Sequence, residues 1–310
     1  MIRVATFATH QLSLAQQMRN QAEWETANIQ ASTNQKSRDY AGIAVDSRRL
    51  ITLENLYQTT GGYNANIDIT DHRLQGMETS VSALFDVASK FRTLLVEALN
   101  ANNAQSAALN QNAAVMLDQA VSLLNLKQDD RYLFAGSAID TAPVDTSVFD
   151  PDDIGYDPND PVIANMGYYA GNDAVLSARI DENVVLDYGV TAKDSGFEAL
   201  LRGLYLAKTA TTTPGAVDKT RLEAALALAN QAIQEVPNVQ ARIGTLRKRL
   251  EETKATHSET QLFAEQQISN IETVDVVQTL SKVSGLQLQL EASYMVTAQM
   301  ANVNLMNFLR

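Results

Sequence analysis

The chain has 310 residues, of which 45% are apolar and 19% charged, and its formal net charge is −12. This composition fits a globular protein with more than one domain and argues against disorder throughout the chain. The absence of cysteine removes disulfides, thiolate metal sites and cysteine nucleophiles. A run of about 18 apolar residues, as a membrane span needs, occurs nowhere, and the first residues lack the apolar core of a secretory signal.

The negative charge is concentrated in the middle of the chain. Residues 139–194 hold 12 acidic and 2 basic side chains, a local balance of −10, whereas the other 254 residues sum to −2. Contacts with nucleic-acid phosphates need Lys and Arg, so this segment argues against nucleic-acid binding. It is expected to form a solvated outer surface.

Proline divides the chain into three parts. All six prolines lie between positions 143 and 237. Because proline breaks helix interiors, long helices are predicted in the two flanks and a helix end at Pro237. A partly alternating run at 174–180 and an apolar run at 184–188 predict a small β or α+β insert in the middle.

The N-terminal flank shows two amphipathic segments. The first is a helix that ends near the polar run 32–39, and it carries an apolar stripe at helical spacing. Its members are Val4, Ala8, Leu12, Ala15 and Met18. After a possible break at Gly61-Gly62, residues 64–101 repeat apolar side chains every 3.5 residues, as in a helix of a coiled-coil-like bundle.

The C-terminal flank ends in a second apolar stripe, within residues 266–310. Ser269 and Glu272 have capping-box spacing, which predicts a helix restart there. The stripe consists of Val276, Leu280, Val283, Leu290, Tyr294, Ala298, Ala301, Leu305 and Phe308. An apolar helix face of this kind is stable only when another surface covers it. The residues alone leave open whether that surface belongs to another subunit or to the same chain, while few basic residues disfavour a membrane surface.

Together these patterns predict a mainly α protein, an elongated helical bundle or rod formed by the terminal segments, with a small inserted β or α+β domain. Five parts are expected. They are an N-terminal axial helix at 1–35, a helical rod at 36–138, a variable β-containing insert at 139–215, a returning helical rod at 216–267 and a C-terminal axial helix at 268–310. The two axial stripes are the predicted assembly interface.

Enzyme and metal signatures are not found in the sequence. His10, His72 and His257 are isolated and are expected at the surface or a bundle edge, and no G-x-S-x-G or glycine-rich phosphate loop occurs. The acidic run at 150–160 lacks the glycine and glutamate of an EF-hand loop, so a solvated turn is favoured over a calcium site. We therefore assign no catalytic, cofactor-binding or metal residues and predict no enzyme.

Several segments resemble the bacterial flagellin family. Ser269, Ile271, Glu272 and Asp275 match the family's Ser-x-Ile-Glu-x-x-Asp start, followed by further matches at Ser281, Gln287, Ala292, Leu309 and Arg310. Asp39, Ala41, Gly42 and Ala44 look like its Asp-Asp-x-Ala-Gly-x-Ala segment. Residues 131–144, RYLFAGSAIDTAPV, are more similar to hook–filament junction members of the family than to filament flagellins.

The resemblance implies a structural subunit whose terminal helices are disordered in the monomer and become ordered on assembly. The implied partners are further copies of the chain, hook-associated protein 1, flagellin, an export chaperone and the type III export apparatus. The implied location is the extracellular flagellum, at the hook–filament junction, after a cytoplasmic stage. Two alternatives remain at this point, a filament flagellin and, more distantly, a hydrolase in the middle domain.

Overall fold

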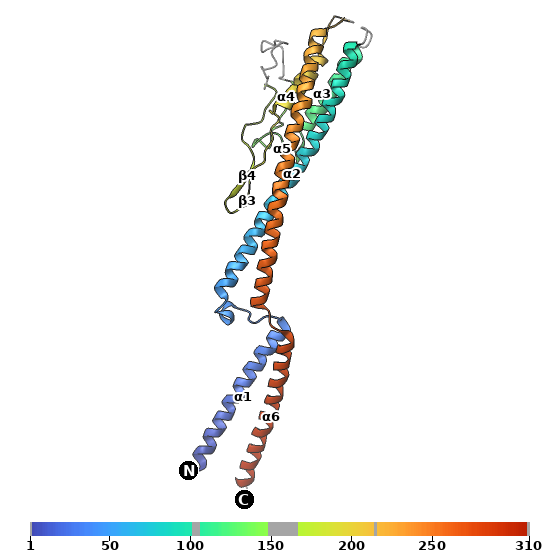
Figure 1. The fold of residues 1–310 in the computed structure, drawn as a ribbon. Helices are drawn as coiled ribbons and strands as arrows, with labels where there is room; N and C mark the ends of the chain where they lie inside the picture. Colours follow the sequence, from blue (N-terminus) through green and yellow to red (C-terminus); the bar gives the residue numbers. More distant parts are fainter. Residues whose placement is uncertain (1, 101–105, 148–166, 214–215, 309–310) are drawn as a thin grey trace. The chain divides into compact units, whose positions relative to one another are not determined.

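The computed structural model describes residues 2–100, 106–147, 167–213 and 216–308 (Figure 1). Helices account for most of these residues. They are α1 (Ile2–Thr33), α2 (Ser47–Asn100), α3 (Ser106–Leu124), α4 (Ser195–Lys208), α5 (Lys219–Glu272) and α6 (Val276–Phe308), with a short 3-10 helix at Tyr40–Ile43. The predicted mainly helical class with a small inserted domain is confirmed.

The strands in the described residues form three antiparallel pairs of two strands each. They are β1 (Lys127–Gln128) with β2 (Arg131–Tyr132), β3 (Ser177–Asp181) with β4 (Val184–Asp187), and β5 (Thr211–Thr213) with β6 (Ala216–Val217). The β3–β4 hairpin falls on the two short runs from which the sequence predicted a β-containing insert. The acidic run 150–160 lies outside the described residues.

The chain divides into two compact units. One unit comprises residues 1–59 and 260–310, and the other comprises residues 60–259. Helices α2 and α5 each run from one unit into the other. The second unit contains the larger core, and the first contains the paired terminal helices.

The heptad pattern of α2 forms the centre of the core of the 60–259 unit. Ile67, Leu74, Val81, Ala88 and Leu95, the residues that recur every seven positions, are each 1% exposed or less. They belong to one apolar cluster with side chains from α3, α4 and α5. The strict repeat predicted this helix because each seventh residue returns to nearly the same face.

Residues 131–144 lie against this core. Leu133 and Phe134 are buried, and the ring of Phe134 meets Phe197 of α4 edge to face at 6.0 Å. Gly136 has φ +67, and a Cβ at this position would lie 2.3 Å from the carbonyl oxygen of Asn172. Glycine is therefore required here by both conformation and space.

Two predicted helix breaks are wrong. Gly61 and Gly62 lie inside α2, and Pro237 lies inside α5. Proline removes one backbone hydrogen bond within the helix, but Val236 and Val239 on either side are buried in the core. Tertiary packing of that face offsets the lost bond, so the helix continues.

The β3–β4 hairpin is tied to α2 and α5 by side chains that donate to its backbone. Asn66 of α2 donates to the carbonyl of Arg179 (3.2 Å), and Nε2 of His257 in α5 lies 2.8 Å from the carbonyl oxygen of Ile180. The ring of His257 stacks on Tyr63, with centroids 5.7 Å apart. His257 is only 7% exposed, so the expected surface position was wrong for this histidine.

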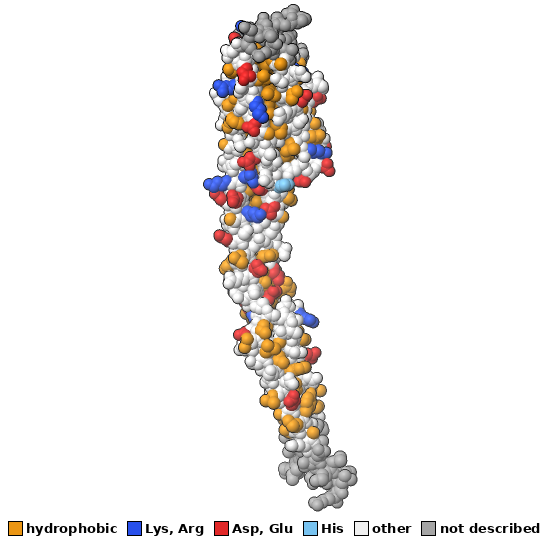
Figure 2. All heavy atoms as spheres, turned by 90° about the vertical axis from the view of Figure 1, so that its right-hand side faces the viewer, with side chains coloured by type: hydrophobic (Ala, Val, Ile, Leu, Met, Phe, Trp, Pro, Cys, Tyr) orange, Lys and Arg blue, Asp and Glu red, His pale blue; other side chains and the backbone are white. Residues whose placement is uncertain are grey.

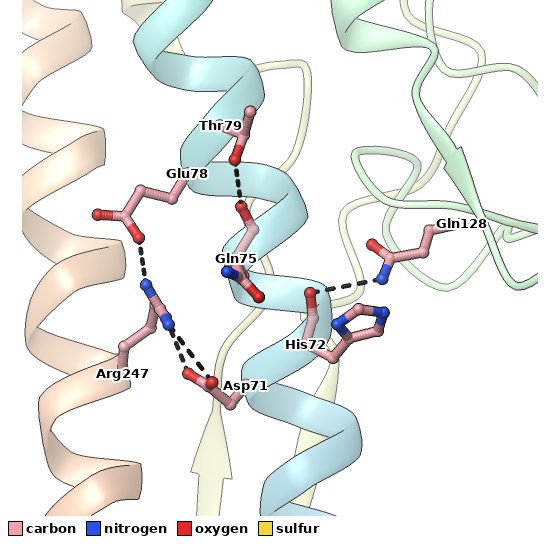
Figure 3. Close-up of polar contacts among 7 residues, drawn as sticks. All are labelled: Asp71, His72, Gln75, Glu78, Thr79, Gln128 and Arg247. Atoms are coloured by element: carbon pink, nitrogen blue, oxygen red, sulfur yellow. Dashed lines mark hydrogen bonds and ion pairs between the residues drawn. The ribbon is translucent and has the colours of Figure 1, made fainter.

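A charged cluster joins α2 to α5 in the same unit (Figure 3). Nε of Arg247 lies 2.8 Å from Asp71, and its Nη1 lies 2.6 Å from Glu78. Hydrogen bonds to these two carboxylates raise the pKa of the guanidinium, so Arg247 stays charged throughout the pH range in which proteins are handled. Lys254 pairs with Asp68 one turn of α2 away. The cluster fixes how α2 and α5 face each other here.

We predict that Arg247→Met lowers the melting temperature of the 60–259 unit by about 2–4 °C, because a well-formed but partly exposed ion pair contributes about 1 kcal/mol. Arg247→Lys is expected to recover only part of this loss, since an ammonium group cannot bind both carboxylates in a fork. Arg249→Met, at an exposed position of the same helix, is the matched control for calorimetry. Equal melting of all three variants would contradict the prediction.

Candidate assembly surface

The terminal helices α1 and α6 pack along each other in opposite directions within the first unit (Figure 1). Their contact residues follow a repeat of three and four positions on both helices, as in a coiled coil. We call these buried or half-buried residues the seam. On α1 they are Ser13, Gln17, Asn20, Trp24, Ala27 and Ala31, and on α6 they are Thr279, Val283, Leu286, Leu290, Ser293 and Thr297.

Half of the seam residues are polar. Gln17, Asn20 and Thr279 are each 8% exposed or less, while the buried apolar residues among the described positions are Ala27, Leu286 and Leu290. The indole N–H of Trp24 is buried and has no hydrogen-bond acceptor in the described part of the chain. A pair that buries few apolar groups and leaves a donor unsatisfied gains little stability from its own seam.

Large apolar side chains lie instead on the outside of the pair. We call these exposed residues the outer apolar face, and Figure 2 shows hydrophobic side chains gathered on α1 and α6 with a few charged ones among them. They are Leu12, Leu14, Met18 and Ile29 on α1 and Val276, Val277, Leu280, Leu288, Tyr294, Met295 and Val296 on α6. Lys282 and Glu291 are the only charged residues among the 33 of α6, so little solvates this face.

The predicted stripe residues divide between the two surfaces. Leu290 and Val283 lie in the seam, whereas most of the other described members are exposed. The exposed members are Ala8, Leu12, Ala15, Met18, Val276, Leu280, Tyr294 and Ala298. Val4, Ala301, Leu305 and Phe308 lie in α1 and α6, but their side chains are outside the described residues. The sequence reading missed the polar seam, whose heptad spacing was the available signal.

Two short connectors join the terminal helices to α2 and α5 and bond to each other. Gln35 and Thr273 form an antiparallel bridge, and the amide of Lys36 donates to the carbonyl of Glu272 at 2.7 Å. The ammonium group of Lys36 also donates to the carbonyls of Asn270 (2.8 Å) and Ile271 (2.7 Å). These carbonyls end α5 and would otherwise lack partners in the helix.

The restart of the C-terminal helix lies later than predicted. Ser269 is inside α5, which ends at Glu272, and α6 begins at Val276. The carboxylate of Asp275 accepts from the amides of Val277 (2.9 Å) and Gln278 (3.1 Å). Asp275 therefore caps α6, and the predicted capping box does not form.

The 60–259 unit contains a buried ion pair in α4. Arg202 lies 2.9 Å from Glu198 one turn earlier, and both side chains are at most 5% exposed. Nearby, burial raises the pKa of Tyr168, whose hydroxyl donates to the carbonyl of Ala192 at 2.9 Å. The charges of Arg202 and Glu198 offset each other inside the core. A buried ion pair of this kind is typical of a structural role.

No group of three potential metal ligands gathers in the described ranges. Among these same residues, no helix combines the length and hydropathy needed to cross a bilayer. The feature that stands out in this part of the chain is therefore the outer apolar face of α1 and α6.

The chain is similar to known proteins of the bacterial flagellum. Residues 226–309 match the bacterial flagellin C-terminal helical region. The whole chain is 23% identical to flagellar hook-associated protein 3 of Escherichia coli K12 over 317 residues, which covers 98% of each protein. The chain is therefore similar to flagellin-family proteins in its C-terminal region and to a flagellar hook-associated protein over nearly its full length. The resemblance predicted from the sequence is thereby confirmed.

Two solved structures share the fold of this chain. A flagellar hook-associated protein from Vibrio parahaemolyticus matches with a TM-score of 0.58 and 18% identity, covering 73% of this chain and 97% of the other. FlgL of Bacillus cereus matches with a TM-score of 0.58 and 16% identity, covering 70% and 99%. At these identities the structural likeness establishes the fold.

The contacts of Lys36 can be tested by substitution. We expect Lys36→Met to speed amide hydrogen exchange in the last turn of α5 about tenfold, because two helix-end carbonyls lose a charged donor. Lys282→Met, an exposed change on α6, should leave that turn unaffected. Hydrogen exchange with mass spectrometry measures the rate in both variants. Unchanged protection in the Lys36 variant would show that the ammonium group does not stabilise the last turn of α5.

Proposed function

We propose that the chain is a structural subunit of the hook–filament junction of the bacterial flagellum, without enzymatic activity. Its outer apolar face on α1 and α6 is the surface by which copies assemble into a ring or helical layer. The observation that carries this proposal is that Gln17, Asn20 and Thr279 are buried in the seam while large apolar side chains of both helices are exposed outside it. The overall similarity to hook-associated protein 3 supports the junction role.

The mechanism is coupled folding and assembly. Burying one Leu, Met or Val side chain contributes about 1.5–3 kcal/mol, and fixing one residue of backbone costs about 1–2 kcal/mol. Within one chain the seam of α1 and α6 buries too few apolar groups to offset that ordering cost. Burial of the outer apolar face between neighbouring copies supplies the missing stabilisation, so the pair is stable when subunits assemble.

The partners follow from the proposed position. Further copies of the chain cover the outer apolar face, hook-associated protein 1 lies on one side of the layer and flagellin on the other. The chain is exported by the flagellar type III apparatus with the help of a chaperone and acts outside the cell. Head-to-tail contacts of one surface type can close as a ring or continue as a helix, which suits a layer that receives filament subunits.

We predict that Leu280→Asp lowers assembly at least tenfold while leaving the melting temperature of the soluble chain unchanged, because Leu280 is 51% exposed and a buried carboxylate at a subunit contact is costly. Leu290→Asp should lower both assembly and the helicity of the soluble chain, since Leu290 is 8% exposed and lies in the seam. Sedimentation and circular dichroism measure the two effects.

Gln289→Asp is the matched control, because it adds the same charge at an exposed position of α6 without removing an apolar group. We expect its effect on assembly to be smaller than that of Leu280→Asp. Normal assembly of the Leu280 variant would contradict the proposed role of the outer apolar face. A loss of monomer stability as large as the loss of assembly would place Leu280 in packing within one chain.

The junction role and the filament role differ in what the purified chain builds alone. We predict that the chain forms rings or short oligomers in a kosmotropic salt, which strengthens apolar burial, and no long filaments. Electron microscopy decides the outcome, and immunogold labelling of flagella should place the chain at the tip of the hook. Micrometre-long filaments, or label along the whole shaft, would favour a filament flagellin.

A further inference from the structure

The outer apolar face contains two methionines whose side chains are exposed. Met18 on α1 is 65% exposed and Met295 on α6 is 63% exposed. Nε2 of Gln17, the residue before Met18, donates to the carbonyl of Ser293 at 3.1 Å and to Oγ1 of Thr297 at 2.6 Å. Because Ser293 and Thr297 flank Met295 in the sequence, the two methionines lie at about the same level along the helix pair.

Both methionines have large apolar neighbours on the same surface. Leu14, one helical turn before Met18, is 41% exposed, and Leu288, two turns before Met295, is 69% exposed. Residues four or seven positions apart lie on nearly the same face of a helix. The two thioether side chains are therefore part of the surface that the proposed function covers with further copies of the chain.

Methionine is the residue that carries the sulfur of this chain, which has eight methionines and no cysteine. A peroxide that reaches the chain therefore meets no thiol, and exposed thioethers are common sites of its attack. Met77, in the core of the 60–259 unit, is 0% exposed and is shielded from the same reagent. Since oxidation requires access to the sulfur atom, Met18 and Met295 should react faster than Met77.

We propose that Met18 and Met295 are oxidation sites at which a hydroperoxide prevents the outer apolar face from assembling. Hydrogen peroxide transfers one oxygen atom to the thioether sulfur. The O–O bond breaks and an S–O bond forms, so the sulfur is oxidised to the sulfoxide while the peroxide is reduced to water. Burying the sulfoxide oxygen against apolar side chains costs free energy unless a hydrogen-bond donor replaces water.

The consequence for assembly rests on the proposed function. Oxidised copies should fail to join a growing layer, whereas copies already in the layer should resist oxidation because their neighbours cover Met18 and Met295. Two methionine sulfoxide reductases, one for each sulfoxide epimer, convert the product back to methionine. The outer apolar face is therefore sensitive to peroxide in soluble subunits, protected in assembled ones, and restored by reduction.

Replacing both methionines by leucine tests whether these two sulfur atoms are responsible. Leucine keeps the apolar character and approximate volume of each side chain, so the Met18→Leu/Met295→Leu variant should assemble normally without oxidant. After treatment with hydrogen peroxide, we expect the unsubstituted chain to lose assembly at least tenfold and the double variant less than twofold. Met116→Leu, at a partly buried position of α3, is the matched control and should lose assembly as the unsubstituted chain does.

An equal loss of assembly in the double variant would overturn the proposal, because the effect would then come from other residues. Unchanged assembly of the unsubstituted chain, with both methionines fully oxidised, would overturn it as well. In the unsubstituted chain, treatment with both sulfoxide reductases should restore assembly. Sedimentation measures each of these results.

Peptide mass spectrometry of the soluble chain decides the modification sites independently of assembly. Met18 and Met295 should each gain one oxygen atom at least tenfold faster than Met77, and both rates should fall at least tenfold in the assembled state. Oxidation of the two sites no faster than that of Met77 would overturn the proposal. Failure of the untreated chain to assemble would count against the proposed function, while the rates in the soluble chain would still decide the sites.

Discussion

The arrangement of the terminal helix pair is the constraint on which the function depends. Two helices that place Gln17, Asn20 and Thr279 between them and Leu280 and Tyr294 outside them gain little from pairing with each other. Their largest possible gain comes from covering the outer apolar face, which needs a second surface of the same character. Under the proposed function, the ends are stabilised mainly by contacts between chains, and their folding is tied to assembly.

The 60–259 unit shows the opposite arrangement. Its α2 heptads are buried completely, Phe134 and Phe197 fill the space between the insert and the helices, and the charged groups of α2 and α5 pair at the rim. This unit buries its apolar side chains within one chain, so it can stay folded in a lone subunit. Under the proposed function, a chain with one self-sufficient unit and one dependent unit stays monomeric until a growing end supplies the missing contacts.

The elements that were predicted correctly from the sequence are those marked by the spacing of apolar residues. The heptads from Ile67 to Leu95 and the hairpin runs were placed correctly, because burial of those side chains dominates the local choice. The continuation of α5 through Pro237 was not predictable, since it depends on the packing of Val236 and Val239 against helices distant in sequence. The polar part of the seam was missed because the sequence reading followed the apolar stripes alone, whereas the side chains between the two helices include Gln17, Asn20 and Thr279.

The polar residues of the seam also limit what the terminal pair can gain within one chain. A fully apolar seam would stabilise the pair in a lone subunit and reduce its dependence on other copies. In this seam Gln17 bonds to Ser293 and Thr297, where apolar contacts would otherwise form. Under the proposed function, this lower stability within the chain is what makes contacts between copies necessary.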